Sequence, residues 1–219
     1  FDLHSTALVI LSYNKRKHNG CRNMAQTKQA KTINQNMVAG MMNYLQSTRH
    51  PVRNTLIFRF SERAGLRAKE IASITWSMIT DGEGNLTGEI VLPDSASKGS
   101  NGGRIIPIAR ELRLAIEAHM EHSNNTESHH RIIQTERAHK TSAQVIVNLF
   151  QKWFSDMGYE GCSSHSGRRT FITNASKKIT SVGGSLRDIQ YLAGHSSLQT
   201  TQRYIDGDSA ARRKIVDLI

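Results

Sequence analysis

The chain has 219 residues, with 29 Lys and Arg against 18 Asp and Glu, which gives a formal net charge of +11 and a pI near 10.0. This length fits one large domain or one domain with an appendage, and no apolar run approaches the ~20 residues of a membrane span. Two distant cysteines, Cys21 and Cys162, exclude a disulfide framework and favour a reducing, intracellular setting. The excess of positive charge points to a polyanionic partner, most often nucleic acid.

Residues 1–29 differ in pattern from the rest of the chain, and we interpret them as an atypical N-terminal extension or remnant. An apolar patch at residues 7–11 stands beside a basic run at 14–20, with no clean hydrophobic period. The patch is too short for a signal peptide, and no suitable cleavage site follows it. We therefore expect one folded unit over residues 30–219.

The folded unit begins with two predicted amphipathic helices. Apolar residues at helical spacing follow a candidate cap at Thr32 or Asn34 and continue to about Gln46. Pro51 starts a second periodic run, and Gly65 stops it in the manner of a glycine that follows a helix end. Both stripes are typical of helices that face a core.

A turn and a small antiparallel sheet come next. Arg67 lies between the second helix and a short third one, in which Glu70 is one turn away on the same face. Taken alone, this pair has the pattern of a surface ion pair that contributes little to stability. Two predicted strands, 88–92 and 104–108, flank a loop of small residues with Lys98 near its tip. Without further context, a solvated role for that lysine is favoured.

Two more helices are predicted, over residues 109–122 and from a cap at Thr141 or Ser142 to Gly158. The region around the polar loop between them is rich in histidines: His119, His122, His129, His130 and His139. Their spacing matches no established metal motif, and the expected carboxylate and cysteine partners are absent, so we predict no metal site. The elements together predict a mainly α fold with one small antiparallel β-sheet (α+β).

The last third of the chain gathers the chemically active residue types. His165 and Arg168 stand three residues apart at the start of a predicted helix, where free backbone N–H groups and the helix dipole favour an anion. Another predicted helix, 185–193, ends at a glycine, and His195 follows in the turn. Tyr204 comes nine residues later, on one more predicted helix that brings it within reach of the same place.

This combination suits cleavage of a phosphodiester without a metal. A tyrosine hydroxyl, with a pKa of ~10, becomes a nucleophile once a neighbour takes its proton. The planar guanidinium of arginine binds two phosphate oxygens at once through hydrogen bonds. Catalysis of phosphoryl transfer depends mostly on positioning and electrostatics. Histidine serves as a base or a hydrogen-bond donor near neutral pH. We interpret the stretch as an active site for phosphate chemistry on DNA.

The ordered set of motifs resembles the catalytic domain of the tyrosine recombinases, the phage integrase family. The motifs are, in chain order, Gly65-Leu66-Arg67, Lys98 in the β-hairpin, His165-Ser166-Gly167-Arg168, Leu192-Ala193-Gly194-His195 and Tyr204. Each motif alone is weak, but the ordered set is specific, and the resemblance covers residues 30–219. It implies a DNA-cleaving and rejoining domain that carries out site-specific recombination or integration, as mobile elements do, with no metal, ATP or other cofactor.

The resemblance also implies a mechanism. Tyr204 would attack the scissile phosphate, giving a 3′-phosphotyrosyl link and a free 5′-hydroxyl, and a partner strand's hydroxyl would reverse the step. Arg67 and Arg168 would hold the non-bridging oxygens. Lys98 would donate a proton to the departing 5′ oxygen.

The remaining roles fall to three residues. His165 would assist the tyrosine, His195 would donate a hydrogen bond to the phosphate, and Glu70, in the family's acidic position, would orient the site. The chain departs from the family pattern in two ways. Its Leu-Gly-His box reads Leu-Ala-Gly-His, which leaves His195 in register. Only a short, poorly patterned segment precedes the first helix, where family members usually carry a helical DNA-clamping domain.

The expected partners are double-stranded DNA and further copies of the chain. These copies would assemble on DNA into a tetrameric synapse in the cytoplasm of a prokaryotic cell, away from any membrane. An apolar segment at 209–219 would dock on its own domain or on a neighbouring protomer.

Two alternatives to the recombinase function stay open. One is a type IB topoisomerase-like enzyme that relaxes supercoils, and the other is a non-catalytic DNA-binding domain, which the complete set of site residues disfavours.

Overall fold

A computed structural model describes residues 29–96, 103–123, 126–136, 138–204 and 216–217. Three predicted segments therefore lie wholly or mostly outside the described residues: all but the last residue of the extension at 1–29, the Lys98 loop at 97–102 and most of the apolar segment at 209–219. None of the described helices is long and apolar enough to cross a membrane.

Helices form most of the described structure, and the prediction of a mainly α fold with a small antiparallel sheet is confirmed. The helices are α2 (Gln35–Gln46), α3 (Pro51–Ala64), α4 (Ala68–Ser73), α5 (Arg110–Glu121), α6 (Ala143–Asp156), α7 (Ser166–Lys178), α8 (Leu186–Ala193) and α9 (Leu198–Gln202). Strands β1 (Glu89–Leu92) and β2 (Arg104–Pro107) pair antiparallel. Short 3₁₀ helices cover Trp76–Met78, Asp94–Ala96 and Ile179–Val182.

Local signals set the helix ends. The Asn34 side chain accepts a hydrogen bond from the Met37 backbone N–H and caps α2, and Ser142 caps α6 in the same way. Gly65 follows α3 with a φ of 63°, in the left-handed region, and a Cβ at this position would come within 2.5 Å of the Phe171 ring. The chain therefore turns sharply into α4, with Arg67 as its N-cap residue.

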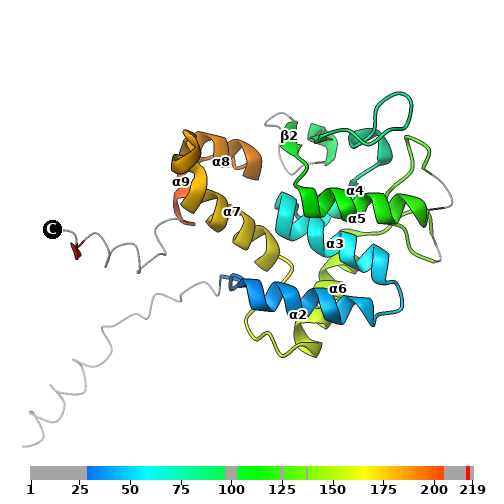
Figure 1. Ribbon diagram of the computed structural model, residues 1–219, viewed down its shortest axis with the longest axis horizontal. Coiled ribbons are helices and arrows are strands. Elements are labelled where there is room, and N and C mark those ends of the chain that lie inside the picture. Colours follow the sequence, from blue (N-terminus) through cyan, green and yellow to red (C-terminus); the bar gives the residue numbers. More distant parts are fainter. Residues whose placement is uncertain (1–28, 97–102, 124–125, 137, 205–215, 218–219) are drawn as a thin grey trace, which may run out of the picture.

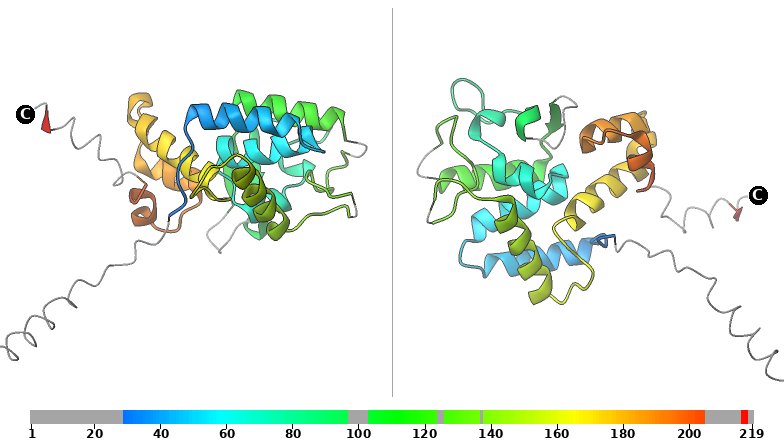
Figure 2. Two further views of the ribbon diagram at one scale, coloured as in Figure 1. Left: turned by 90° about the horizontal axis from the view of Figure 1, so that it is seen from below. Right: turned by 180° about the vertical axis from the view of Figure 1, so that it is seen from behind.

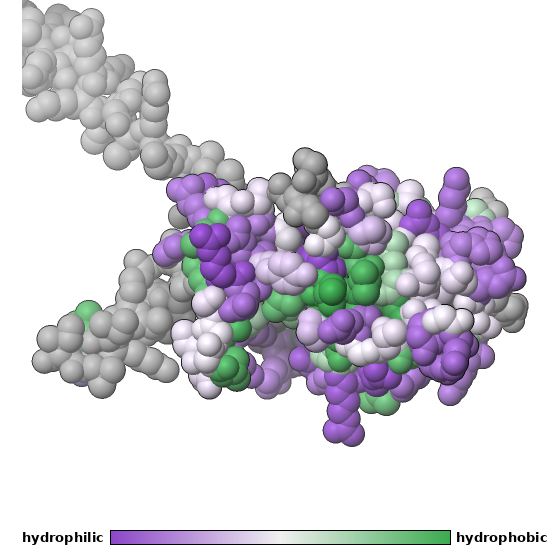
Figure 3. Space-filling view, turned by 90° about the horizontal axis from the view of Figure 1, so that it is seen from above, coloured by the Kyte–Doolittle hydropathy of each residue, from purple (hydrophilic) through white to green (hydrophobic). Residues whose placement is uncertain are grey.

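The β-hairpin has one inward and one outward face. Val91 and Ile105 are paired across the strands and are 52% and 41% exposed. Figure 3 looks down on the side where Figure 1 places β2, and it shows a central apolar area bordered by hydrophilic residues. Ile90 and Ile106 point into the core, and Arg104 takes an inward position of the same alternation while only 4% exposed. A charged side chain therefore occupies a core position of β2.

The apolar core has two parts. The larger part is formed by the five helices from α2 through α6 together with the β-hairpin. Trp76 and Phe150 are among its largest buried side chains. The smaller part consists of Ile172 from α7 and Ile189 and Ala193 from α8. In Figures 1 and 2, α7, α8 and α9 form a group to one side of the remaining helices. Arg67 and Arg168 lie where these two groups of helices meet, since each forms hydrogen bonds across the junction.

Candidate active site

The structure brings together the described site residues from segments that are far apart in the sequence. Arg67 and Glu70 stand at the start of α4, His165 and Arg168 at the start of α7, and His195 directly after the Gly194 that ends α8. Tyr204 lies two residues beyond the end of α9, so the prediction that a helix carries it is wrong in this detail. Lys98 lies outside the described residues, and its role stays a prediction.

A pocket of about 360 Å³ contains the candidate nucleophile, with His165, Arg168, Arg169 and Tyr204 in its lining. The His195 ring stacks on the Tyr204 ring at a centroid distance of 5.5 Å and an interplanar angle of 22°. The Arg169 guanidinium lies 5.9 Å from the centroid of the same ring. Tyr204 is therefore held among cationic and imidazole side chains.

The C-terminal end of α8 accepts a hydrogen bond from each of three arginines. The bonds run from Arg104 Nε to the Leu192 carbonyl at 3.0 Å, from Arg168 to the carbonyl of Ala193, and from Arg67 Nη2 to that of Gly194 at 3.1 Å. The last carbonyls of a helix lack partners within the helix and carry the negative end of its dipole. They are therefore suited to hold guanidinium groups close together.

Glu70 connects two of these arginines. Its Oε1 accepts from Arg67 Nη1 at 3.0 Å and from Arg104 Nη1 at 2.9 Å, and its Oε2 accepts from the Arg67 backbone N–H at 2.7 Å and from Arg104 Nη2 at 2.9 Å. The residue is only 1% exposed. Burial alone would raise the pKa of Glu70, but the bonds and charges of Arg104 and Arg67 lower it below its usual value. The reading of Arg67 and Glu70 as a surface ion pair is therefore wrong.

Sequence reasoning missed Arg104. The residue begins the second predicted strand, and the alternation of that strand places it on the same side as Ile106. A charged residue on the core side of a strand needs a buried partner. The inward position of Arg104 in its strand could have indicated a buried ion pair. It does not show which carboxylate is the partner of Arg104.

The arginines shift the pKa values of their neighbours. Burial, followed by the charge of Arg67, lowers the pKa of Arg168 to about 9, which leaves it protonated at neutral pH. Burial, together with Arg168 and Arg67, also lowers the pKa of His165. The same causes, together with the charge of Arg104, lower the pKa of His195 to about 4. The lowered pKa values favour the neutral form of both imidazoles.

The environment of His195 defines which of its nitrogens is available. Its Nδ1 lies 3.0 Å from the Thr201 hydroxyl, and Thr201 is fully buried. When Nδ1 accepts the threonine hydrogen, the proton of the neutral ring is on Nε2. That nitrogen can then donate a hydrogen bond to a phosphate oxygen.

A group of potential metal ligands lies outside this pocket. Glu127, His129 and His130 place their ligand atoms within 4.8 Å of one another, so Glu127 is the carboxylate that the sequence did not associate with these histidines. The Glu127 and His129 side chains are 65% and 72% exposed. None of the three residues lines the pocket of Tyr204. The prediction of no metal site stays a prediction.

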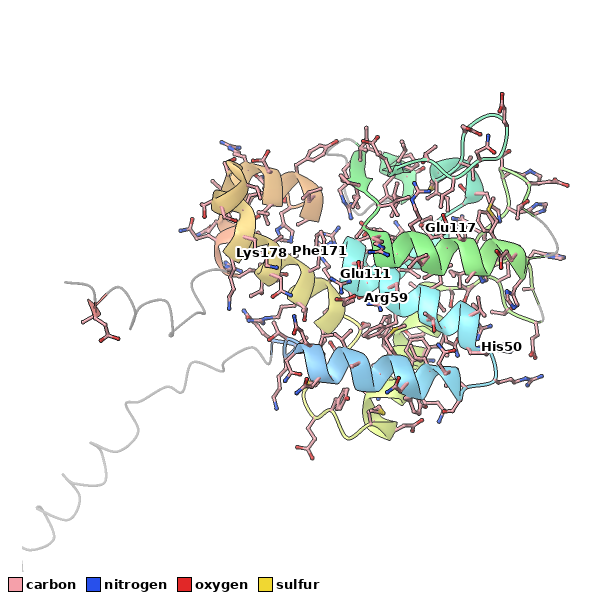
Figure 4. All side chains as sticks on the ribbon, viewed as in Figure 1. His50, Arg59, Glu111, Glu117, Phe171 and Lys178 are labelled. Atoms are coloured by element: carbon pink, nitrogen blue, oxygen red, sulfur yellow. The ribbon has the colours of Figure 1, made fainter. Side chains whose placement is uncertain are left out.

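Another pocket, of about 700 Å³, lies against α2, α3 and α7. Arg59 of α3 and Phe171 of α7, both labelled in Figure 4, are among its lining residues. Glu62 is 7% exposed there, and it is paired with Arg59 at 3.1 Å and with Arg63 at 3.0 Å. Both ion pairs lie within α3, and none of the predicted site residues lines the pocket.

The fold and the order of these residues define a tyrosine recombinase catalytic domain. The profile described as "Phage integrase family" matches residues 31–210, and the chain belongs to this family. It is 32% identical to tyrosine recombinase XerA of Thermococcus onnurineus over 69% of this chain and 50% of that protein. It is 28% identical to tyrosine recombinase XerC of Rhizobium meliloti over 75% of this chain and 49% of that protein. The chain thus spans about half the length of these relatives.

Solved structures share the fold. A crystal structure of XerA recombinase superposes with a TM-score of 0.65 at 20% identity, covering 85% of this chain and 64% of that one. A lambda integrase dimer bound to a core site gives a TM-score of 0.62 at 18% identity, covering 82% of this chain and 49% of that one. The predicted fold class is confirmed by both similarities.

Proposed function

We propose that this chain is the catalytic part of a site-specific DNA recombinase that breaks and rejoins strands through a 3′-phosphotyrosyl intermediate. The observation that carries the proposal is the cluster of Arg67, Arg104 and Arg168 around the buried carboxylate of Glu70, beside the pocket of Tyr204. The cluster has a surplus of buried positive charge, which a phosphodiester compensates. Membership of the phage integrase family supports the same reaction.

Cleavage forms one bond and breaks one bond. The Tyr204 oxygen bonds to phosphorus while the bond from phosphorus to the 5′ oxygen breaks, and Lys98 supplies the proton that the leaving oxygen needs. His165, whose pKa is lowered by burial and by the charges of Arg168 and Arg67, accepts the tyrosine proton or aligns the hydroxyl. Arg67 and Arg168 stabilise the charge that grows on the non-bridging oxygens. Attack by a 5′-hydroxyl of the partner strand reverses each step and rejoins the DNA.

The other two predicted residues support this arrangement. His195 donates from Nε2 to the phosphate while Thr201 holds Nδ1 at 3.0 Å. Glu70 orients Arg67 through bonds to both its guanidinium and its backbone N–H. The proposed mechanism requires no metal and no nucleotide cofactor.

The proposed partner is double-stranded DNA in the cytoplasm of a prokaryotic cell, with assembly of several protomers on the recombining sites. The net charge of +11 favours a polyanion, and the XerH and lambda integrase neighbours were solved bound to DNA. The similarity to recombinases makes a topoisomerase-like enzyme or a non-catalytic DNA-binding domain less favoured.

The test is incubation with candidate mobile-element junction duplexes that carry a nick, followed by a denaturing gel. A covalent protein–DNA band and a single mapped phosphate are expected for a site-specific recombinase. Relaxation of supercoils without preference for any junction would instead favour the topoisomerase reading. A salt-sensitive complex with no covalent product on any junction would favour a non-catalytic DNA-binding domain.

A further inference from the structure

Arg104 bonds the carboxylate that holds Arg67, and it bonds the same end of α8 through a different carbonyl. The Arg67 guanidinium donates to Glu70 Oε1 at 3.0 Å and to the Gly194 carbonyl at 3.1 Å. Arg104 donates to both oxygens of Glu70, each at 2.9 Å, and to the Leu192 carbonyl at 3.0 Å. The buried guanidinium of Arg104 therefore holds in place both Glu70 and the end of α8, and Arg67 is bonded to each of them.

We propose that Arg104 is the positioning residue for Arg67, and that it acts through Glu70 and the end of α8 and makes no contact with DNA. This inference rests on the proposed function, because it concerns the same phosphate site. The Arg104 side chain is 4% exposed and that of Arg67 is 23% exposed. Arg67 is thus accessible to a phosphate, whereas Arg104 is shielded.

Electrostatics explains why two arginines are needed. If Glu70 were paired with Arg67 alone, its charge would compensate the cation that has to meet the phosphate. Because Arg104 also pairs with Glu70, the charge of Arg67 is left in surplus for the substrate. The planar fork of Arg104 also fixes the orientation of the carboxylate through two hydrogen bonds, which the point charge of a lysine does not do.

The end of α8 is shaped to accept Arg104. Gly194 has a φ of 57°, in the left-handed region, and a Cβ there would lie 2.8 Å from Arg104 Nη1 and 3.1 Å from its Cζ. Glycine satisfies both the backbone conformation and the close approach of the guanidinium. Gly194 therefore has two roles, since it ends α8 and leaves room for the guanidinium of Arg104.

The experiment compares Arg104→Met and Arg104→Lys with Arg67→Ala and with Arg49→Met. Arg49 is 79% exposed and is paired with Glu136, so it controls for the loss of one positive charge. The substrate is the nicked duplex whose cleavage site has been mapped for the wild type. It carries at the scissile position either the normal phosphodiester or a methylphosphonate, which has no negative charge. Single-turnover formation of the covalent complex and DNA affinity are both measured.

On the phosphodiester, Arg104→Met should cleave about 10²-fold more slowly than wild type, because a small displacement of a preorganised group has an effect of this order. The cleavage rate of Arg104→Lys should lie between those of the wild type and Arg104→Met. The DNA affinity of every variant should stay within about threefold of the wild-type affinity. On the methylphosphonate there is little charge for Arg67 to neutralise. Arg67→Ala and Arg104→Met should therefore both approach the wild-type rate within about threefold.

Two results overturn the inference. One is an Arg104→Met protein that cleaves the phosphodiester as fast as Arg49→Met. The other is a defect equally large on both substrates, which indicates general damage to the fold. If Arg104→Met does not fold, Arg104→Lys is judged by the same two criteria. A wild-type protein that forms no covalent complex on any junction overturns the proposed function itself, and the inference with it.

Discussion

Arg67 and Gly194 are 127 residues apart in the chain, yet Arg67 Nη2 donates to the Gly194 carbonyl at 3.1 Å. The contact joins the start of α4, in the larger group of helices, to the turn that follows α8. Because His195 is the next residue, the position of this histidine and that of the Arg67 guanidinium depend on one helix end. A shift of α8 would disturb both groups together.

Tyr204→Phe should abolish the covalent complex and leave DNA affinity nearly unchanged. The substitution removes one hydroxyl and keeps the ring that stacks on His195 at 5.5 Å. The measurement is a nicked substrate that traps the wild type as a slow band on a denaturing gel. If the variant still forms that band, another residue is the nucleophile.

Arg168→Ala should slow cleavage by roughly 10²–10³, the effect expected for loss of a preorganised donor to a transition-state oxygen. The side chain is 4% exposed and donates to the Gly65 carbonyl at 2.6 Å and to the Ala193 carbonyl. Arg168→Lys keeps the positive charge but lacks the planar guanidinium, so its cleavage rate shows how much of the effect of Arg168 depends on hydrogen-bond geometry. Thermal melting is the control for folding. A change of less than about threefold in the alanine variant would count against the assigned role.

His195 should make the stability of the protein depend on pH. Its pKa is about 4 in the folded chain, against an unperturbed value of 6.5. The unfolded state therefore binds more protons between these values, and stability should fall as pH decreases from about 6.5 toward 4. Because solvent reaches the ring, we expect a loss on the order of 1 kcal/mol. Urea unfolding of wild type and His195→Gln at pH 7.5 and pH 5 checks this, and parallel losses in both would contradict it.

Cleavage should persist in excess chelator, because the proposed chemistry depends on Tyr204 and the arginines. The Glu127, His129 and His130 group offers a matched control, since none of its residues lines the pocket of Tyr204. Glu127→Gln should cleave at the wild-type rate with and without chelator. Loss of wild-type activity in chelator that magnesium or zinc restores would overturn the metal-free mechanism.

Local features of the sequence determined most of the helix boundaries and the list of candidate residues. A cap at Asn34 and a left-handed glycine at Gly65 act within one helical turn, so they can be recognised without knowledge of the packing. His165, Arg168 and His195 were likewise found from short spacings, whereas Arg67 and Lys98 were assigned only through the resemblance to the tyrosine recombinases. The predicted strands 88–92 and 104–108 are observed as Glu89–Leu92 and Arg104–Pro107, and every strand end agrees within one residue.

Only the tertiary structure decided how these residues act on one another. The bonds of Arg104 to Glu70 and to the Leu192 carbonyl join positions 34 and 88 residues apart, and they form because β2 packs against α8 and Arg104 reaches Glu70 of α4. The low pKa of His195 likewise arises from burial and from three arginines on other elements. Hydrogen bonds and charge interactions at this range depend on distances set by packing, whereas capping and periodicity depend on neighbours in the chain. The sequence therefore determined which groups are present, and the packing determined their orientation and charge.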